Sequence, residues 1–341
     1  MERPMWTVSS APHIIEKRFA RAAMTDVLIA LVPALMAGIY FFGFYIFKVV
    51  LICMVFSVGT EILIHRILKK KILPEDGSAA LVTGILLAFC LPPRIPLWIA
   101  ALGGVIAIAL VKELFGGLGF NIFNPALAAR AVLIASWPVA MTRWVPPKGG
   151  TLSGLGGVLP DAIASATPLH AMKLAYTYQS SPETLTLAQN IISQFSHFSV
   201  WWNLFVGKIG GSLGETSALA LLVGAIYLLW RRVIDWRIPL AYLGSVLGLA
   251  LLFGRDPFFN LLAGGVILGA FFMATDYVTS PVTKKGRWIF GAGCGIFTII
   301  IRFYGGYPEG VCYSILIMNM LTPLIDKFSI PRVFGKVKKV A

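Results

Sequence analysis

Residues 112–130 read KELFGGLGFNIFNPALAAR, and this stretch decides how the chain around it folds. Apolar runs lie on both sides of it, and its three glycines (116, 117 and 119) interrupt the helical pattern, because glycine readily leaves helical geometry. Asn121 and Asn124 can satisfy the freed backbone groups or cap a new helix that has Pro125 at its first position. The stretch therefore predicts a helix that breaks at the glycines and a second helix that begins in apolar surroundings.

The predicted break presents polar groups to an ion. The N-terminal dipole of the second helix, the carbonyl groups of the glycine segment and the carboxylate of Glu113 together suit a cation or the polar edge of a ring. We therefore expect Glu113, Asn121 and Asn124 to line an ion path. The alternative is a packing bend whose ends are only capped.

The composition indicates a membrane protein. Hydrophobic residues make up 57% of the 341 residues and charged residues 13%, and the mean hydropathy is +0.81. A soluble domain has roughly 25% charged residues. The net charge of +14 is explained by lysines and arginines in loops that orient the helices, so nucleic-acid binding is not expected.

Hydropathy predicts an all-α polytopic protein of about ten transmembrane helices, since a bilayer requires roughly 20 apolar residues per span. The third and fifth spans are short, which suits half-helices and broken helices buried among their neighbours. The predicted spans are Met24–Phe44, Tyr45–Ile67, Ala79–Leu91, Ile95–Phe115, Phe123–Trp137, Glu215–Trp230, Ile238–Phe253, Phe258–Tyr277, Trp288–Arg302 and Gly310–Ile325.

The charges between the spans orient the chain. Most lysines and arginines fall on the side of the N-terminus, which indicates that both termini are cytoplasmic. The long loop after the fifth span then lies outside the cytoplasm. The resulting regions are a cytoplasmic N-terminal segment (1–23), a first transmembrane repeat (24–137), an extracytoplasmic loop (138–214), a second transmembrane repeat (215–326) and a basic cytoplasmic tail (327–341).

An internal repeat supports this division. Five spans per half is an odd number, so the two halves must have opposite topology, as in the inverted repeats of many transport proteins. Chance coincidence is the alternative, because glycine is common in membrane helices. At a constant offset of 189 positions the paired residues are Lys48 with Arg237, Gly59 with Gly248, Arg66 with Arg255, Gly104 with Gly293, Gly116 with Gly305 and Gly117 with Gly306.

Ionisable residues inside apolar runs need a partner or a watery cavity. Glu61 and His65 lie one helical turn apart, with Arg66 beside them. We interpret them as an interfacial group that snorkels toward water, and not as an ion site.

Residues 161–169 read DAIASATPL and lie in the long loop. Thr167 offers a hydroxyl on a segment that we expect to be solvated, with small residues before it and Pro168 fixing the chain beyond. A hydroxyl in that setting can be reached by a transferase that attaches a cofactor. The alternative is an ordinary loop threonine, because short motifs have many false positives.

Other cofactor classes are not expected on this chain. The cysteines are widely spaced, show no C-x-x-C pattern and fall mostly in apolar spans. We therefore predict neither a metal site nor an iron–sulfur cluster, and no catalytic residue of the chain's own. The four cysteines are Cys53, Cys90, Cys294 and Cys312.

Two segments, FNIFNPAL at 120–127 and ATPL at 166–169, resemble the RnfD/NqrB family. With the basic N-terminus, the ten predicted spans and the long loop, the resemblance covers nearly the whole chain. NqrB proteins carry a longer N-terminal extension, whereas this chain reaches its first span by about Met24, so RnfD is the better match.

The loop motif matches the D-x-x-S-G-A-T signature of that family only in part. Asp161, Ala166 and Thr167 match, whereas Ser165 stands where glycine is usual and Ala164 where a hydroxyl residue is usual. Serine is also small, so we retain the expectation that the motif carries a flavin.

The resemblance implies two flavins. FMN would be esterified through its phosphate to the Thr167 hydroxyl, with Asp161, Ser165 and Ala166 beside it, and a noncovalent flavin such as riboflavin would lie among the helices. Arg130 would hold a flavin phosphate or ring carbonyl, or pair with a carboxylate.

The resemblance also implies the setting, which is a subunit of the Rnf complex, an ion-translocating ferredoxin:NAD⁺ oxidoreductase of the bacterial cytoplasmic membrane that moves Na⁺ or H⁺. The partners would be the A, B, C, E and G subunits, the flavin transferase and the lipid membrane. A flavin-free channel or secondary transporter with the same inverted halves is one alternative, and a passive scaffold is another.

Overall fold

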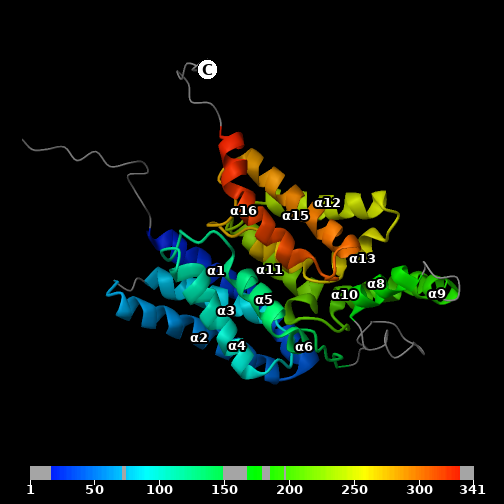
Figure 1. Ribbon diagram of the computed structural model, residues 1–341, viewed down its shortest axis with the longest axis horizontal. Helices are drawn as coiled ribbons and strands as arrows, with labels where there is room; N and C mark the ends of the chain where they lie inside the picture. Colours follow the sequence, from blue (N-terminus) through cyan, green and yellow to red (C-terminus); the bar gives the residue numbers. More distant parts are fainter. Residues whose placement is uncertain (1–16, 71–73, 149–166, 179–184, 196, 331–341) are drawn as a thin grey trace, which may run out of the picture.

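The computed structural model describes residues 17–70, 74–148, 167–178, 185–195 and 197–330. All regular elements in these residues are helices, which confirms the predicted all-α class (Figure 1). Four of these helices are long and apolar enough to cross a membrane: Arg21–Phe42, Tyr45–Ile67, Lys284–Tyr304 and Val311–Ser329. By the length and composition of these helices the chain is a multi-pass membrane protein.

The first group of helices contains the glycine stretch and ends with two helices that follow it. Its members are α1 (Lys17–Phe42), α2 (Tyr45–Ile67), α3 (Pro74–Phe89), α4 (Leu97–Ile106), the π-helix η1 (Ala107–Glu113), α5 (Pro125–Ser136) and the short α6 (Pro138–Met141). Gly116, Gly117 and Gly119 all have positive φ, which breaks the chain between η1 and α5 as the sequence predicts.

The helices of the second group occur in a similar order, but the chain of this group breaks at a different place. Its members are the 3₁₀ turn η3 (Leu213–Glu215), α11 (Ala218–Trp230), α12 (Arg237–Leu252), α13 (Pro257–Leu262), α14 (Val266–Leu268), the π-helix η4 (Gly269–Met273), α15 (Lys284–Tyr304) and α16 (Val311–Ser329). The eighth predicted span is thus interrupted after α13, where Gly264 has a φ of +72°.

The two groups pack closely through α1 and α11. A side chain at Gly224 of α11 would meet the backbone oxygen of Ala30 of α1 at 2.0 Å, so only glycine fits there. Small residues at a crossing let helix backbones approach, which is how apolar helices gain contact where no hydrophobic force drives them together. One core of buried apolar side chains extends across both groups, from Ala23 to Ile325.

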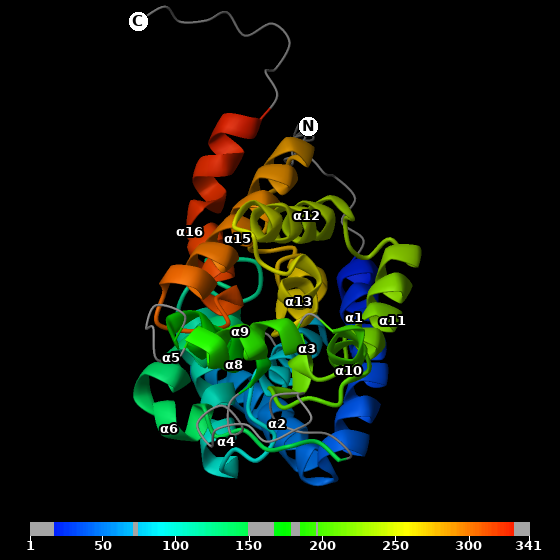
Figure 2. The ribbon, with the colours of Figure 1, turned by 90° about the vertical axis from the view of Figure 1, so that its right-hand side faces the viewer.

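Three helices between the groups form a separate layer: α8 (Pro168–Tyr178), α9 (Leu185–Phe195) and α10 (Phe198–Val206). They lie at the end of the molecule opposite to the start of α1 and the end of α16, and Figure 2 shows them in front of the bundle. A second apolar core joins them to α13 through Phe259 and Ala263. This docking places Thr167, which directly precedes α8, against the second group.

Candidate functional site

The break predicted from the sequence contains a capped helix start. The Asn124 side chain accepts hydrogen bonds from the backbone N–H groups of Ala126 (3.1 Å) and Leu127 (3.3 Å), and Pro125 occupies the first position of α5. The Asn124 amide also donates to the carbonyl oxygen of Met273 in η4 at 3.3 Å. The cap prediction is confirmed, and the cap also joins the two groups of helices.

A small cavity of about 80 Å³ lies at this junction. Asn121 and Asn124 both line it, and so does Asp276 of the second group. Asn121 donates to the carbonyl oxygen of Phe123 at 3.1 Å, so it satisfies a backbone group freed by the break. The ion-path role of the two asparagines stays a prediction.

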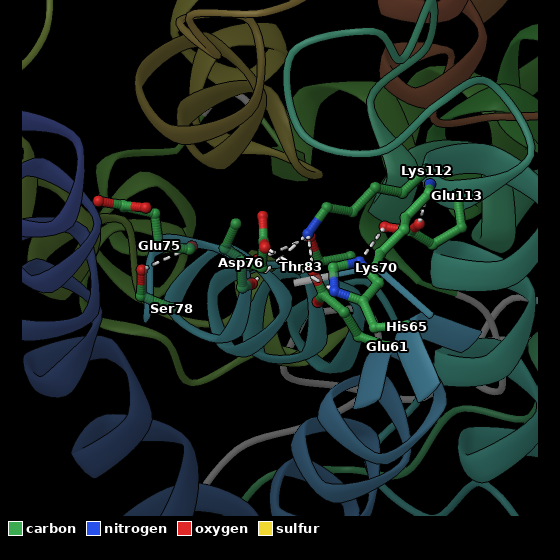
Figure 3. Close-up of polar contacts among 10 residues, drawn as sticks. Glu61, His65, Lys70, Glu75, Asp76, Ser78, Thr83, Lys112 and Glu113 are labelled. Carbon is green, nitrogen blue, oxygen red and sulfur yellow. Dashed lines mark hydrogen bonds and ion pairs between the residues drawn. The ribbon is translucent and has the colours of Figure 1, made fainter. Parts of the chain in front are cut away.

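A group of ionisable residues, here called the histidine cluster, lies beside this cavity: Glu61, His65, Lys70, Asp76, Lys112 and Glu113 (Figure 3). Lys112 joins the cavity to the cluster, because it lines the cavity and its Nζ donates to Glu61 Oε1 at 2.5 Å. Glu113 belongs to the cluster and contacts His65 Nε2 and Lys70 Nζ, each at 3.3 Å.

The interpretation of Glu61 and His65 as a snorkelling group is wrong. Glu61 is 2% exposed and His65 5% exposed, whereas their neighbour Arg66 is exposed. The two side chains lie between α2, α3 and η1. Burial is possible there because Lys112 pairs with Glu61, and His65 lies beside carboxylates of α3 and η1. Only the general rule that a charge inside a membrane needs a partner could have pointed to Lys112.

The carboxylates and the imidazole of Glu61, His65 and Glu113 lie within 4.8 Å of one another, a spacing that also suits a metal ion. Two ammonium groups already contact the carboxylates, however, because Lys112 contacts Glu61 and Lys70 contacts Glu113. The cluster is therefore held together by cations of the chain itself.

A larger cavity of about 400 Å³, here called the threonine pocket, lies at the other end of the bundle. Its volume falls within the roughly 300–1,000 Å³ usual for ligand pockets. The Thr167 side chain lines it and is 8% exposed, so the expectation of a solvated threonine is wrong. The lining residues are Arg130, Ile134, Met141, Thr142, Trp144, Thr167, His170, Gly306, Tyr307, Pro308, Glu309, Gly310, Cys312 and Tyr313.

Arg130 forms the charged floor of the threonine pocket. It makes an ion pair with Glu309 and lies 3.7 Å from Glu215 Oε1, so it has the carboxylate partner that the sequence left open. Arg302 lies behind this pair and donates to the backbone oxygens of Glu309 (2.9 Å) and Ala263 (2.9 Å). Sequence reasoning missed Glu215, Glu309 and Arg302 because each is far from Arg130 along the chain.

The helix that follows Thr167 is fixed by contacts along its length. The Arg255 guanidinium lies between two rings, 3.6 Å from the ring centre of Tyr176 in α8 and 4.1 Å from that of Phe303 in α15. Lys173 of α8 donates to the carbonyl oxygen of Gly305. These contacts hold α8, which begins directly after Thr167, against the second group.

One titratable side chain of α8 faces the pocket. Burial and the nearby Lys173 ammonium both lower the pKa of His170 below its ordinary value. His170 is therefore neutral at pH 7, and one of its ring nitrogens can donate a hydrogen bond while the other accepts one.

Three of the predicted flavin residues, Asp161, Ser165 and Ala166, lie outside the described residues. The four cysteines lie inside them and are buried as free thiols. The structure thus brings Thr167 and Arg130 together at one cavity. It places Asn121 and Asn124 at another cavity, and Glu113 in the histidine cluster beside that second cavity.

Membrane-length apolar helices, buried ion pairs and two cavities beside broken helices define a multi-pass membrane protein with polar groups in its interior, and such interiors are typical of transport and redox proteins. The chain belongs to the NQR2, RnfD, RnfE family, whose sequence model matches residues 7–335. This confirms the resemblance drawn from the sequence.

The chain matches several relatives over nearly its whole length. It is 49% identical to the D subunit of the Na⁺-translocating ferredoxin:NAD⁺ oxidoreductase complex of Acetobacterium woodii and 44% identical to the D subunit of the proton-translocating complex of Clostridium ljungdahlii, with 98% of each chain covered in both comparisons. It is 38% identical to the D subunit of an ion-translocating oxidoreductase complex of Halorhodospira halophila, over 96% of this chain and 95% of the relative.

Proposed function

We propose that this chain is the D subunit of an ion-translocating ferredoxin:NAD⁺ oxidoreductase complex of the bacterial cytoplasmic membrane and that it carries FMN on Thr167. The names of its relatives support the assignment to the complex. The observation that carries the flavin proposal is that Thr167 and Arg130 line the same 400 Å³ cavity. The alternatives of a flavin-free transporter and a passive scaffold give no reason for this juxtaposition.

The residues of the threonine pocket fit an anionic cofactor with a planar ring. The Thr167 hydroxyl would carry the phosphate ester, and Arg130 or His170 would bind a phosphate or ring oxygen. The rings of Tyr307 and Tyr313, whose centres are 5.4 Å apart, offer apolar faces to a flat ligand. FMN would supply the electron-transfer chemistry, and the protein would position and tune it.

We further propose ten spans in two inverted repeats. The helices of the two groups correspond in order at the offset of 189 positions: α1 with α11, α2 with α12, α3 with α14 and η4, α4 with α15, and α5 with α16. Corresponding helices also meet, since α1 packs on α11 and α5 on α16. Contacts between equivalent elements are what an axis between inverted halves produces.

This arrangement supports the proposed orientation and ion path. The start of α1 and the end of α16 lie opposite to α8, as cytoplasmic termini and an extracytoplasmic Thr167 require (Figure 1). Glu113, Asn121 and Asn124 would contribute to the path, and riboflavin would be the second flavin among the helices. One relative belongs to a Na⁺-translocating complex and another to a proton-translocating complex. The names of the relatives therefore do not decide which of the two ions is moved.

The test is the flavin fluorescence of the subunit band after denaturing electrophoresis, with the chain expressed beside the other subunits and the flavin transferase. A phosphoester needs the side-chain oxygen, so Thr167→Ala should lose the fluorescence and Thr167→Ser should retain part of it. Thr142→Ala, which removes another hydroxyl at the same pocket, is the matched control and should fluoresce like wild type.

Two further readouts complete this test. Ser165→Gly, which restores the family residue, should brighten the band, and a reporter inserted within residues 138–214 should read as extracytoplasmic. A fluorescent Thr167→Ala band would refute the attachment site, and a colourless wild-type chain would favour the transporter.

A further inference from the structure

The guanidinium of Arg302 binds three separate points of the backbone. Arg302 lies in the last turn of α15 and is 3% exposed. Its Nε donates to the carbonyl oxygen of Glu309 at 2.9 Å, its Nη1 to that of Asn260 at 2.5 Å and its Nη2 to that of Ala263 at 2.9 Å. A planar fork of donors can hold several acceptors at fixed positions at once. Arg302 therefore fixes the path of the chain around it.

Two of these carbonyl groups belong to the end of α13. The last four carbonyl groups of a helix have no partner within the helix. The chain leaves α13 at Gly264, where φ is +72°, so a further helical turn does not follow directly. Arg302 supplies donors to Asn260 and Ala263 in place of that turn. The break in the second group is thus stabilised by a side chain from another helix.

The start of α8 lies against the same break. A side chain at Gly264 would meet Leu169 Cδ1 at 2.6 Å and Arg302 Nη2 at 3.0 Å, so both residues lie close to this glycine. Leu169 follows Thr167 by two positions, and the carbonyl oxygen of Thr167 accepts from the backbone N–H of Ala171 at 2.8 Å. The position of Thr167 therefore depends on the break that Arg302 stabilises.

The third carbonyl group belongs to the loop at 305–310, here called the pocket loop, which reads GGYPEG. All of its residues except the first line the threonine pocket. Lys173 of α8 donates to the first carbonyl group of the loop, and Arg302 donates to the carbonyl group of Glu309 near its end. The Glu309 carboxylate pairs with Arg130. The pocket loop is thus attached at both ends by cationic side chains.

The internal repeat does not account for Arg302. At the offset of 189 positions, the equivalent residue of the first group is Glu113, and an ionised carboxylate cannot donate a hydrogen bond. The glycines after it do correspond, because Gly116 and Gly117 pair with Gly305 and Gly306. Both groups therefore have a glycine break at this position, but the guanidinium belongs to the group whose break forms the threonine pocket.

We propose that Arg302 is a positioning residue of the flavin site, whose three hydrogen bonds hold the start of α8 and the pocket loop together so that Thr167 and Arg130 face one cavity. The proposal rests on the proposed function, because the flavin supplies the reason to hold these two residues in place. Arg302 acts through the backbone and lies behind the residues that line the pocket. Replacing it should loosen the pocket loop and leave every lining side chain in place.

The first test measures the reactivity of Cys312, which lines the threonine pocket. The intact complex carries Thr167→Ala in this test, so that flavin attachment has no part in the result. In Arg302→Gln the pocket loop should open more often, and N-ethylmaleimide should label Cys312 roughly tenfold faster or more, as the loss of hydrogen bonds from a charged group implies. Mass spectrometry of the labelled peptides gives the rate.

Three comparisons separate positioning from other effects. Arg302→Lys keeps the positive charge but has one donor nitrogen in place of three, so we expect it to label faster as well. Cys294 is buried in α15, two turns before Arg302, and its labelling rate should not change. Arg287→Gln removes an arginine that also donates to a backbone oxygen, at the other end of α15, and should label Cys312 like the parent complex.

The second test reads the flavin band in chains that keep Thr167. Both Arg302 variants should carry several-fold less FMN than wild type, whereas Arg287→Gln should carry the wild-type amount. Since Arg302 acts in part through Glu309, the losses in Arg302→Gln and Glu309→Gln should be less than additive in the double variant. Fully additive losses would show that Arg302 acts independently of the pocket loop and would contradict the proposal.

The labelling results decide the remaining cases. Unchanged Cys312 labelling in the Arg302 variants would overturn the proposal, and so would equal acceleration at Cys312 and Cys294, which indicates general loosening. Wild-type labelling in Arg302→Lys would show that the charge is sufficient without the fork of donors. If Arg302→Gln does not accumulate, Arg302→Lys carries the test. A colourless wild-type chain would refute the proposed flavin but not the labelling result, so the two proposals can fail independently.

Discussion

The histidine cluster and the threonine pocket both bury ion pairs among apolar helices, but they use different cations. The cations at the threonine pocket are Arg130, which lines it, and Arg302, which lies behind it. A guanidinium keeps its charge at any physiological pH. In the histidine cluster the groups that contact the carboxylates are lysine ammonium groups and an imidazole, which differ from guanidinium in that they are able to release a proton. Permanently charged guanidinium groups thus lie at one end of the bundle, whereas ammonium and imidazole groups lie at the other.

The largest expected effect comes from removing the fixed charge. Arg130→Met leaves the buried Glu215 and the half-buried Glu309 without the guanidinium that pairs with both, and breaking a buried pair in this way costs about 3–5 kcal/mol. The measurement is the melting temperature of the detergent-solubilised complex together with the flavin band. Arg143→Met changes an exposed arginine near the same pocket and is the control. An unchanged melting temperature in Arg130→Met would show that the pocket does not depend on a fixed charge.

A smaller effect is expected from loosening the helix that carries Thr167. Arg255→Gln removes the guanidinium between Tyr176 and Phe303, and cation–π contacts contribute about 0.5–2 kcal/mol. We expect weaker flavin attachment with ion transport per bound flavin unchanged, because the histidine cluster is distant from this contact. The control is Arg94→Gln, because Arg94 is an exposed arginine in a different loop. Loss of transport at normal flavin content would contradict a purely positional role.

The junction between the two regions should respond to loss of the cap. Asn124→Ala removes the acceptor for two backbone N–H groups and the bond to Met273, a loss of about 1 kcal/mol in soluble helices. Because little water is available to replace the cap, we expect slower or uncoupled ion transport with the flavin still attached. Vesicle transport per electron is the measurement. Normal transport would remove this segment from the ion path.

The smallest effect concerns acid stability away from both regions. Burial acts to raise the pKa of Asp235, but hydrogen bonds from the backbone and side chain of Arg237 and from Arg287 outweigh it and lower the pKa below 3.8. A carboxylate with a lowered pKa stabilises the fold above its unfolded value, and that contribution is lost as the pH falls through the folded value. The melting temperature of wild type should therefore drop slightly more than that of Asp235→Asn below pH 4. Parallel curves would contradict this.

Local features were predictable from the sequence and distant pairings were not. The glycine break and the Asn124 cap depend on residues within a few positions of one another, so the pattern in 112–130 contained them. Glu61 with Lys112 and Arg130 with Glu309 join residues from different helices. Only the packing of those helices brings them together, and for this reason the sequence suggested water for Glu61 and left Arg130 undecided.

The geometry of the π-helix η1 determines where two side chains of the histidine cluster point. A π-helix holds more residues per turn than an α-helix and appears mostly as a short insertion within an α-helix, frequently at a functional site. Lys112 and Glu113 are its last two residues. If η1 rewound to α-geometry, the register would slip by one residue, and one residue corresponds to about 100° of rotation about the axis. Rewinding of η1 would therefore turn both side chains away from Glu61 and His65.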